Sequence, residues 1–244
     1  PGALIALLVL IVREPGRSHN AGGNATAAPG MGAVMRNLWI NRRAFLAIHF
    51  SSALFGIYGN GFAGWYPSLL IRSHGLTAAE AGTQLGLAYL VFGSLGTIAG
   101  GRWSERLALS GRPDANLRVV AYAAAAALIP ATLAPLMPSP LLVLAMFAPA
   151  CFVYYTYFSC GTAAIQLASP PEMRGTNSAL FLLTNALVGL SAGMLAVPMA
   201  DRYLFGETGN LGRALALVAA LGCGGALLFA RSGLAAYGAL VERN

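Results

Sequence analysis

Two short motifs in the chain match the patterns of enzyme sites, and both fall inside long apolar runs. Gly59-Asn60-Gly61-Phe62-Ala63-Gly64 matches the G-x-G-x-x-G pattern that binds the diphosphate of a dinucleotide. That pattern works between a strand and a helix, with an acidic residue about 20 positions later. Gly189-Leu190-Ser191-Ala192-Gly193 matches the G-x-S-x-G nucleophile elbow, which also follows a strand. The sequence supplies neither context, so both motifs are interpreted as helix-packing glycines and no enzyme is predicted.

The side chains that remain as candidates are uncharged hydrogen-bonding groups near the middle of apolar runs. They are Tyr58, Tyr89, Tyr154, Tyr157 and Asn185. No Asp, Glu, Lys or Arg lies deep in any run, although such a charge usually marks a proton relay or an ion site in a membrane. Because a buried tyrosine hydroxyl requires a hydrogen-bond partner, each candidate either lines a substrate cavity or bonds to another helix. Both alternatives remain open at this point.

One histidine and three cysteines complete the reactive side chains inside the runs. His49 lies about one and a half turns into its predicted helix, where it either forms a hydrogen bond near the membrane surface or takes part in a proton relay. Cys151, Cys160 and Cys223 have no C-x-x-C spacing and are expected to pack as small apolar side chains. No metal and no cofactor is expected.

Composition indicates an integral membrane protein. Of the 244 residues, 57% are hydrophobic and only 9% are charged, whereas a soluble domain has about 25% charged residues. All fifteen basic residues are Arg, and the formal net charge is +7. The arginines lie in short segments between apolar runs, where basic residues orient helices in a bilayer. The lipid bilayer is therefore the expected partner, and nucleic acid is excluded.

The uncharged runs predict six membrane-spanning helices. A bilayer core about 30 Å thick requires about 20 residues of helix. The run between Arg118 and Glu172 is too long for one span, and Pro135, Pro138 and Pro140 divide it, because proline ends a helix. The predicted spans cover 43–66, 79–101, 117–136, 141–168, 174–199 and 211–230, so the bundle occupies 43–230.

The remaining segments are predicted from their composition and length. Residues 1–12 are apolar but reach only about 18 Å as a helix, so we expect them to be the end of a preceding transmembrane helix in a longer protein. Residues 13–42 begin with a stretch rich in Gly, Ala, Ser and Asn and are expected to form a cytoplasmic linker. Residues 231–244 are expected to form a cytoplasmic tail.

The distribution of arginine predicts the orientation of the bundle. Twelve arginines fall in alternate loops on one side, and three (Arg72, Arg202 and Arg213) fall on the other. By the positive-inside rule the first side, which holds the C-terminus, is cytoplasmic. Trp39 and Trp103 are expected at the inner boundary, and Trp65 and Tyr66 at the outer one.

The glycines inside the spans predict close helix contacts. Gly82, Gly86, Gly93, Gly96 and Gly100 form one smooth stripe that another backbone can approach. The first span carries a denser cluster, Gly56, Gly59, Gly61 and Gly64, which indicates either a bend near the outer leaflet or plain packing. Thr77-Ala78-Ala79-Glu80 has the pattern of a capping box at the start of the second span.

The segment after the second span resembles a transporter signature. Gly101-Arg102-Trp103-Ser104-Glu105-Arg106-Leu107 is similar to the G-x-L-A/S-D-R motif of the major facilitator superfamily, in the copy that joins helices 8 and 9. Glu105 stands where the family usually has Asp, and the closing basic run is reduced to Arg112. The resemblance implies a cytoplasmic gate made by Gly101, Arg102, Glu105 and Arg106, with a sharp turn at the glycine pair.

Other segments resemble the spinster-like branch of that superfamily. Residues 65–76 look like the outer end of its helix 7, and residues 171–180 look like the start of its helix 11, which continues through Asn185, Pro198 and Asp201-Arg202. The resemblance covers about residues 1–230 and maps the spans onto helices 7–12. It implies an all-α membrane protein, the C-terminal six-helix bundle of a twelve-helix major facilitator fold. The N-terminal six-helix half of the same protein is then the expected partner.

The function implied by the resemblance is secondary active transport. The expected substrate is amphiphilic or lipid-like and crosses by alternating access, with proton coupling left open because the family's coupling carboxylate lies in the N-terminal half. A bacterial inner membrane is the expected location. Two alternatives stay open, namely a transporter of a small organic metabolite and a non-transporting scaffold or sensor on the same fold.

Overall fold

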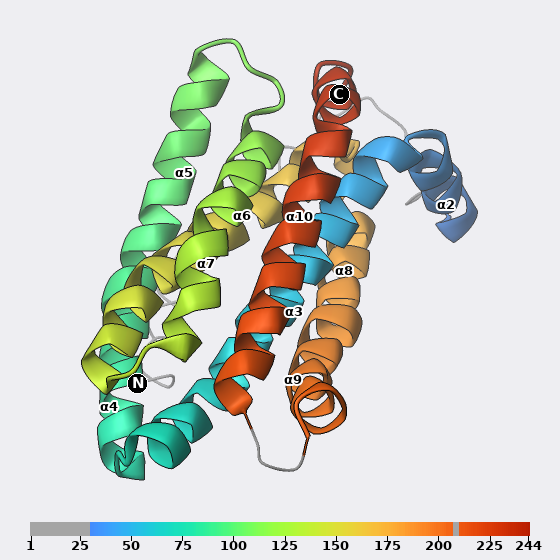
Figure 1. The fold of residues 1–244 in the computed structure, drawn as a ribbon. Coiled ribbons are helices and arrows are strands. Elements are labelled where there is room, and N and C mark those ends of the chain that lie inside the picture. The colour runs from blue at the N-terminus through green and yellow to red at the C-terminus, as the bar shows by residue number, and fades with distance from the viewer. Residues whose placement is uncertain (1–29, 207–209) are drawn as a thin grey trace, which may run out of the picture.

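The computed structural model describes residues 30–206 and 210–244, which form a bundle of long helices running alternately up and down (Figure 1). No strand occurs among the described residues. The predicted end of a preceding helix (1–12) and the first part of the predicted linker (13–29) lie outside the described residues. The α-helices are α2 (Met31–Ile40), α3 (Arg42–His74), α4 (Ala78–Ala88), α5 (Ser94–Leu109), α6 (Ala115–Leu133), α7 (Pro140–Leu167), α8 (Arg174–Thr184), α9 (Ser191–Leu204) and α10 (Leu211–Val241).

Short helical segments of other geometry join several of these helices. Two are π-helical, η1 (Tyr89–Gly93) between α4 and α5, and η4 (Asn185–Leu190) between α8 and α9. Two are 3-10 turns, η2 (Ala134–Leu136) after α6 and η3 (Pro171–Met173) before α8. As a result Ala78–Leu109 and Pro171–Leu204 are each one continuous helical segment of membrane-crossing length. The part of the chain that the structure describes therefore contains the six predicted spans.

One of the six spans is less apolar than the others. Five of the segments are long and hydrophobic enough to cross a membrane by composition, and α3 is not among them although it has 33 residues. α3 packs against α10, α9 and α7, and its Ser51, Ser52 and Tyr58 are buried inside the bundle. Because much of its surface contacts other helices instead of lipid, α3 can carry polar residues that a lipid-facing helix cannot.

Three helical segments extend beyond the predicted spans. α3 continues past residue 66 to His74, α10 continues past residue 230 to Val241, and residues 31–40 of the predicted linker form α2. Arg is a good helix former, and a helix need not stop at the membrane surface, so the membrane boundaries of the spans stay a prediction. The signal that ends α3 is Gly75, whose φ of 71° is left-handed. The expected tail is therefore helical through Val241.

The dense glycine cluster of α3 is a packing surface. A Cβ on Gly56 would lie 3.2 Å from the Cα of Gly189, and a Cβ on Gly193 would lie 2.7 Å from the carbonyl oxygen of Ile57. α3 is a continuous helix through this region. The contacts support the packing alternative, and the helix is not broken at the cluster. The two enzyme-like motifs are thus facing parts of one helix–helix contact.

Only part of the second glycine stripe contacts another helix within the described residues. A Cβ on Gly96 would overlap the carbonyl oxygen of Phe152, and one on Gly100 would lie 2.6 Å from the carbonyl oxygen of Thr156, so α5 and α7 touch through their backbones. A Cβ on Gly82 or Gly86 would meet no described atom within 4 Å. The stripe therefore packs α5 against α7 at one end and is open at the other.

The predicted capping box is confirmed at the start of α4. The backbone N–H of Thr77 donates to the Glu80 carboxylate at 2.8 Å, and the backbone N–H of Glu80 donates to the Thr77 hydroxyl at 3.2 Å. These two bonds satisfy amides that the first helical turn leaves without partners.

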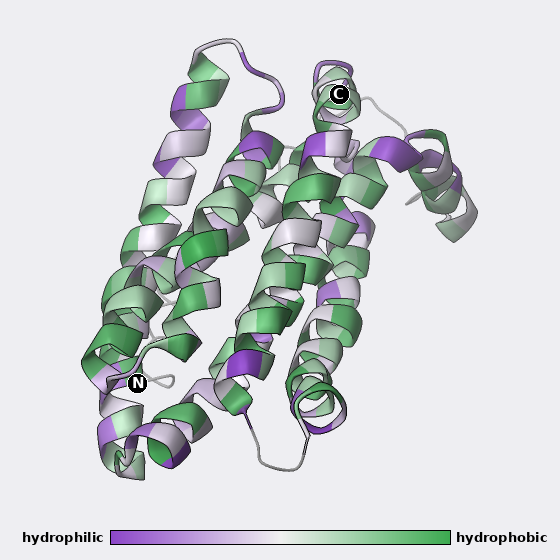
Figure 2. Ribbon diagram, in the orientation of Figure 1, coloured by the Kyte–Doolittle hydropathy of each residue, from purple (hydrophilic) through white to green (hydrophobic). Residues whose placement is uncertain are grey.

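Arginine is concentrated at one end of the bundle, which is called the arginine-rich end below. Among the described residues ten arginines lie at the end that contains the starts of α3, α6 and α8 and the ends of α5 and α10, and three lie at the other. Figure 2 shows the hydrophobic residues along the middle of the helices and hydrophilic ones toward the ends. The ten are Arg36, Arg42, Arg43, Arg102, Arg106, Arg112, Arg118, Arg174, Arg231 and Arg243.

The glycine contacts make a matched prediction for stability. Gly96→Ala should lower the free energy of unfolding by about 1–3 kcal/mol, because the new methyl group collides with α7 backbone that has no room to move. Gly86→Ala, in the same span, should leave stability unchanged or raise it by up to about 1 kcal/mol, since alanine favours helix and meets open space. Reversible unfolding in detergent measures both. Equal effects of the two substitutions would contradict the packing account.

Candidate functional site

Seven aromatic side chains form a closed ring inside the bundle, and each contacts the next. Neighbouring centroids around this aromatic ring are 4.4 to 6.3 Å apart, and most pairs meet edge to face. Such pairs are among the favoured geometries for aromatic side chains. In order around the ring the members are Tyr58, Phe62, Tyr66, Phe147, Tyr89, Tyr155 and Tyr154.

Helical spacing explains how the ring is assembled. Tyr58, Phe62 and Tyr66 are four residues apart on α3, so they lie along one face of that helix. On the side of the ring opposite α3, α7 supplies Phe147 and, about two turns later, Tyr154 and Tyr155. Tyr89 is the first residue of η1. A π-helical turn in an α-helix often marks a functional site, and here it lies where that helix joins the ring.

The ring borders a cavity of about 120 Å³, and none of the described residues that line it is charged. All members of the ring except Tyr66 line it, together with Gly59, Asn60, Ala63 and Cys151. A Cβ on Gly59 would overlap the ring of Tyr154, so glycine is required where that tyrosine enters. An apolar cavity of about 150 Å³ is known to hold benzene. This one therefore accommodates one small group, such as the end or headgroup of a larger molecule.

The structure brings three of the five predicted cavity residues to this space. Tyr58, Tyr89 and Tyr154 line it. The hydroxyl of Tyr58 also donates to the carbonyl oxygen of Ala150 at 3.3 Å, so both alternatives for that residue hold at once: it bonds to α7 and its ring borders the cavity.

The other two predicted cavity residues lie in helix contacts. The ring of Tyr157 is 2% exposed and packs on Phe55 with centroids 4.4 Å apart. Asn185 lies at the start of η4, donates to the carbonyl oxygen of Phe181 at 3.3 Å, and packs beside Gly56. Neither residue lines the aromatic cavity, because the first points into the core and the second faces the α3–η4 contact.

Comparison with known proteins agrees with this architecture. Residues 1–194 match the family model of the Major Facilitator Superfamily. The chain belongs to this superfamily. It is 31% identical over 234 residues to an MFS-type efflux pump of Mycolicibacterium smegmatis (strain ATCC 700084 / mc(2)155), and the match covers 93% of this chain and 52% of the relative. The chain thus spans about half the length of the curated relative it matches.

Solved structures confirm the predicted fold. The chain resembles a bacterial homolog to the human lysosomal transporter Spinster in an inward-facing, unoccupied conformation, with a TM-score of 0.62 and 21% identity over 99% of this chain and 57% of the other. The inward-facing, occupied form gives a TM-score of 0.59 and 20% identity over 100% and 56% of the two chains. At this identity the likeness establishes the fold, a six-helix bundle of the major facilitator type.

The major facilitator signature does not lie in a loop. Gly101, Arg102, Glu105 and Arg106 all lie within α5, which continues to Leu109, so the predicted sharp turn at the glycine pair is wrong. A single glycine costs a helix only about 1 kcal/mol, and the residues around the pair favour helix. The chain turns later, near Gly111, which has a φ of 79°.

The charged residues of the signature are exposed on α5. Among the described residues the ion pair that forms at this end joins Arg118 to Asp114, both at the start of α6. Arg102 and Arg106 instead line an open, mostly apolar groove of about 510 Å³, with Trp103 and Phe152. The gate residues therefore face outward from the described part of the bundle, and their gating role stays a prediction.

The signature residue that does hold α5 to its neighbour is Ser104. Its hydroxyl is buried and donates to the side-chain oxygen of Asn116 on α6 at 2.8 Å. Sequence reasoning passed over this residue because it searched the motif for charge. The available signal was the residue type: Ser104 is a small residue with a hydroxyl group, and it lies in the motif between the charged residues and the next helix.

His49 connects α3 to α8. Its Nδ1 lies 3.2 Å from the hydroxyl oxygen of Thr184, and its ring meets Phe181 edge to face at 5.8 Å. The Thr184 hydroxyl in turn donates to the carbonyl oxygen of Leu180 at 2.9 Å. This arrangement supports the hydrogen-bonding alternative for His49, between helices of the bundle.

Four members of the aromatic ring were not selected from the sequence. Phe62 and Phe147 have no hydrogen-bonding group, Tyr155 was not among the candidates, and Tyr66 was expected at the outer membrane boundary. Tyr66 is fully buried inside the bundle, and its position at the outer boundary stays a prediction. The available signal was the four-residue spacing of aromatic residues on α3, but no sequence rule indicated that α7 and η1 would complete the ring.

Thiol labelling tests which tyrosines border accessible space. In a protein whose native cysteines are replaced, Tyr89→Cys and Tyr154→Cys should react with a small water-soluble methanethiosulfonate. Tyr157→Cys should react at least about tenfold more slowly, because its side chain is reached only when the helix contact opens. The reaction rate is followed by mass spectrometry in detergent. Similar rates at all three positions would show that the cavity has been assigned wrongly.

Proposed function

We propose that this protein is a secondary active transporter that moves an amphiphilic or lipid-like substrate across the membrane by alternating access. The observation that carries the proposal is the aromatic ring around a cavity without charge, within the membrane-spanning part of the bundle. Membership of the Major Facilitator Superfamily and the likeness to an efflux pump and to a Spinster homolog support transport in general.

The chemistry of the cavity favours an amphiphile over a small ion. A dehydrated ion requires charged or carbonyl ligands to replace its water, and this cavity offers aromatic faces and tyrosine hydroxyls. The aromatic faces contribute apolar contact, and the tyrosine hydroxyls that have no partner among the described residues provide hydrogen bonds to a polar group. A volume of about 120 Å³ takes in one end of the substrate, and the remainder extends through the opening of the cavity.

Two spans carry the apolar surface that alternating access requires. Ala78–Leu109 and Pro171–Leu204 are the least buried of the apolar spans. Both contain a π-helical segment. We propose that the N-terminal six-helix half of the same protein covers these faces and moves against them. Their exposed apolar residues include Leu87, Leu90, Val91, Leu95, Ile98, Leu182, Leu183, Leu187, Leu190 and Leu195.

The proposed orientation follows from the arginine-rich end. That end, which carries the C-terminus, is placed in the cytoplasm by the positive-inside rule, in a bacterial inner membrane. Among the described residues no acid lines the aromatic cavity. If transport is proton-coupled, the coupling carboxylate therefore belongs to the N-terminal half.

Transport by ring variants tests the proposal. In proteoliposomes that contain a fluorescent single-chain amphiphile, Tyr89→Leu should lower uptake by about threefold to tenfold, because an aromatic contact contributes about 0.5–1.5 kcal/mol. Tyr89→Phe, which keeps the ring, should retain most activity. Tyr203→Leu is the control, since Tyr203 is 74% exposed and outside the ring. No uptake by the unmodified protein would favour a scaffold or sensor, and uptake of a polar metabolite alone would favour the metabolite transporter.

The cytoplasmic gate has its own test. Glu105→Ala should lower transport by about threefold or more without lowering stability, because Glu105 is exposed on α5 and acts on the proposed partner half through roughly one charge-assisted contact. Glu242→Ala removes another exposed acid at the same end and should have no effect. Normal transport by a well-expressed Glu105→Ala protein would contradict the proposed cytoplasmic gate.

A further inference from the structure

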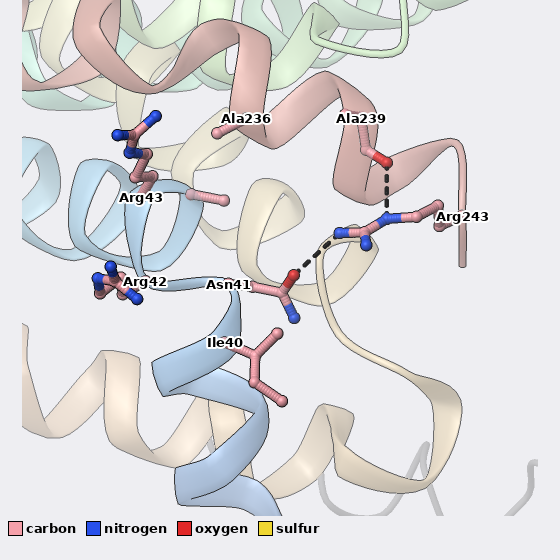
Figure 3. A pocket seen from close by; sticks show the side chains of 8 residues that line it. Ile40, Asn41, Arg42, Arg43, Ala236, Ala239 and Arg243 are labelled. Atoms are coloured by element: carbon pink, nitrogen blue, oxygen red, sulfur yellow. Dashed lines mark hydrogen bonds between the residues drawn. The ribbon is translucent and has the colours of Figure 1, made fainter.

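A second, strongly basic pocket lies at the arginine-rich end, far along the bundle from the aromatic ring. It has a volume of about 530 Å³ and opens at the corner where α2 turns into α3, beside the last turns of α10 (Figure 3). The lining residues are Ile40, Asn41, Arg42, Arg43, Ala44, Ala236, Ala239 and Arg243.

Small side chains on α10 leave the space for this pocket. Just below it, Gly233 packs directly against Ala47 of α3, so the two helices are close there. Above that contact α10 presents Ala236 and Ala239, which do not reach across to α3. The arginines of α3 and of the α10 terminus therefore border an open space instead of a packed one.

Two of the three arginines are anchored at fixed places on the rim. Arg243 donates from Nη2 to the side-chain oxygen of Asn41 at 2.9 Å and from Nε to the carbonyl oxygen of Ala239 at 3.1 Å, which joins the end of α10 to the start of α3 (Figure 3). Arg42 lies over the ring of Trp39, 5.7 Å from its centroid. Figure 3 shows Arg42 and Arg43 on one side of the pocket and Arg243 on the other. Each guanidinium group keeps further N–H donors for a ligand.

The positive charge of the pocket has no acidic partner within the described residues. None of the lining residues is acidic, and the ion pair found in this part of the chain, Asp114 with Arg118, lies elsewhere. Guanidinium groups form paired hydrogen bonds to phosphate oxygens. Three of them around one opening match a phosphate group better than any neutral ligand.

The first turn of α3 adds to the attraction for an anion. Asn41 occupies the N-cap position of α3 but makes no capping bond to it, because its side-chain oxygen accepts from Arg243 instead. The amides of Ala44 and Phe45 already donate to the carbonyl oxygen of Asn41. The backbone N–H groups that this turn can offer to a negative group are therefore those of Arg42 and Arg43.

The helix next to the pocket indicates where the ligand comes from. Met31, Met35 and Trp39 repeat every fourth residue on α2, and all three are exposed. Such an apolar face, with tryptophan at its end, is typical of a helix that lies in the membrane interface. α2 thus places the opening of the pocket at the depth of the lipid headgroups.

We infer that this pocket binds the phosphate group of an anionic membrane lipid. The headgroup phosphate lies between Arg42, Arg43 and Arg243, and the acyl chains lie beside α2. The site is separate from the aromatic cavity, so the inference does not depend on transport or on the nature of the substrate. A lipid bound here ties the end of α10 to the α2–α3 corner.

Native mass spectrometry of the purified protein tests the assignment by counting bound lipids. The probes are phosphatidylglycerol and phosphatidylcholine with the same chains, and free glycerol phosphate as the soluble competitor. The test variant is Arg43→Gln with Arg243→Gln. The matched control is Arg72→Gln with Arg213→Gln, which removes two exposed arginines from the opposite end. A further variant, Arg43→Lys with Arg243→Lys, keeps the charge and loses the planar fork. Circular dichroism verifies that each variant remains helical.

We expect the unmodified protein to retain phosphatidylglycerol over phosphatidylcholine. Each arginine near a membrane surface is worth about fivefold in affinity, so the Gln pair should weaken phosphatidylglycerol binding at least about twentyfold and leave phosphatidylcholine binding unchanged. The Lys pair should fall between, and it decides the case if the Gln pair loses helix. The control pair should behave like the unmodified protein.

Three results would overturn the inference. Equal retention of the two lipids would show that the headgroup charge is not recognised. Equal loss in the control pair would show a general effect of charge, without a site. Displacement of the lipid by glycerol phosphate at matched concentration would assign the pocket to a soluble phosphate compound and remove the membrane lipid as its ligand.

Discussion

The close approach of α3 to its neighbours is the contact on which the rest of this structure depends. Inside a bilayer, helices gain little from hydrophobic burial and associate through close packing of small residues. Gly56 meets Gly189, and Gly61 meets Gly193, so α3 lies directly against the helix that carries η4. Gly59, on another side of α3, admits the ring of Tyr154. The aromatic ring can close only because α3 lies this near to α7.

The sequence predicted the bundle well because its main signals are lengths and charges. Uncharged runs long enough to cross a bilayer located all six spans, and the prolines after residue 133 correctly divided the longest run. Helix ends were predicted less well, since a charge marks a membrane surface but does not end a helix. α10 therefore continues beyond Arg231, and α5 continues through the glycine pair at 100–101.

The site was only partly predictable, for a different physical reason. A search for polar groups in apolar runs found Tyr58, Tyr89 and Tyr154, which do border the cavity, but it selected Tyr157 and Asn185 equally, although these pack between helices. Which of two buried tyrosines faces a cavity depends on how neighbouring helices are rotated. That rotation is set by glycine contacts between segments about 90 to 130 residues apart, and no local pattern reports it.

The middle of the bundle and its arginine-rich end have different chemistry, and this supports a division of tasks. The middle of the bundle offers aromatic surface without charge, suited to part of an amphiphile. The arginine-rich end offers guanidinium groups, suited to phosphate. Among the apolar spans that the structure describes, the two least buried, Ala78–Leu109 and Pro171–Leu204, are the ones with π-helical segments. Segments of this kind allow a helix to change its local winding, which is useful in a transporter whose halves move against each other.

The central claim, that the aromatic ring encloses the substrate site, is tested most directly by photo-crosslinking. A single-chain amphiphile carrying a diazirine is irradiated with the protein in nanodiscs, and the modified residues are located by mass spectrometry. The account predicts adducts on 58–63 and 147–155 that excess unlabelled amphiphile suppresses. It also predicts that Gly59→Ala, which displaces the ring of Tyr154, reduces them. Adducts confined to the exposed apolar faces of α4, α5, α8 and α9, or adducts that unlabelled amphiphile leaves unchanged, would contradict the account.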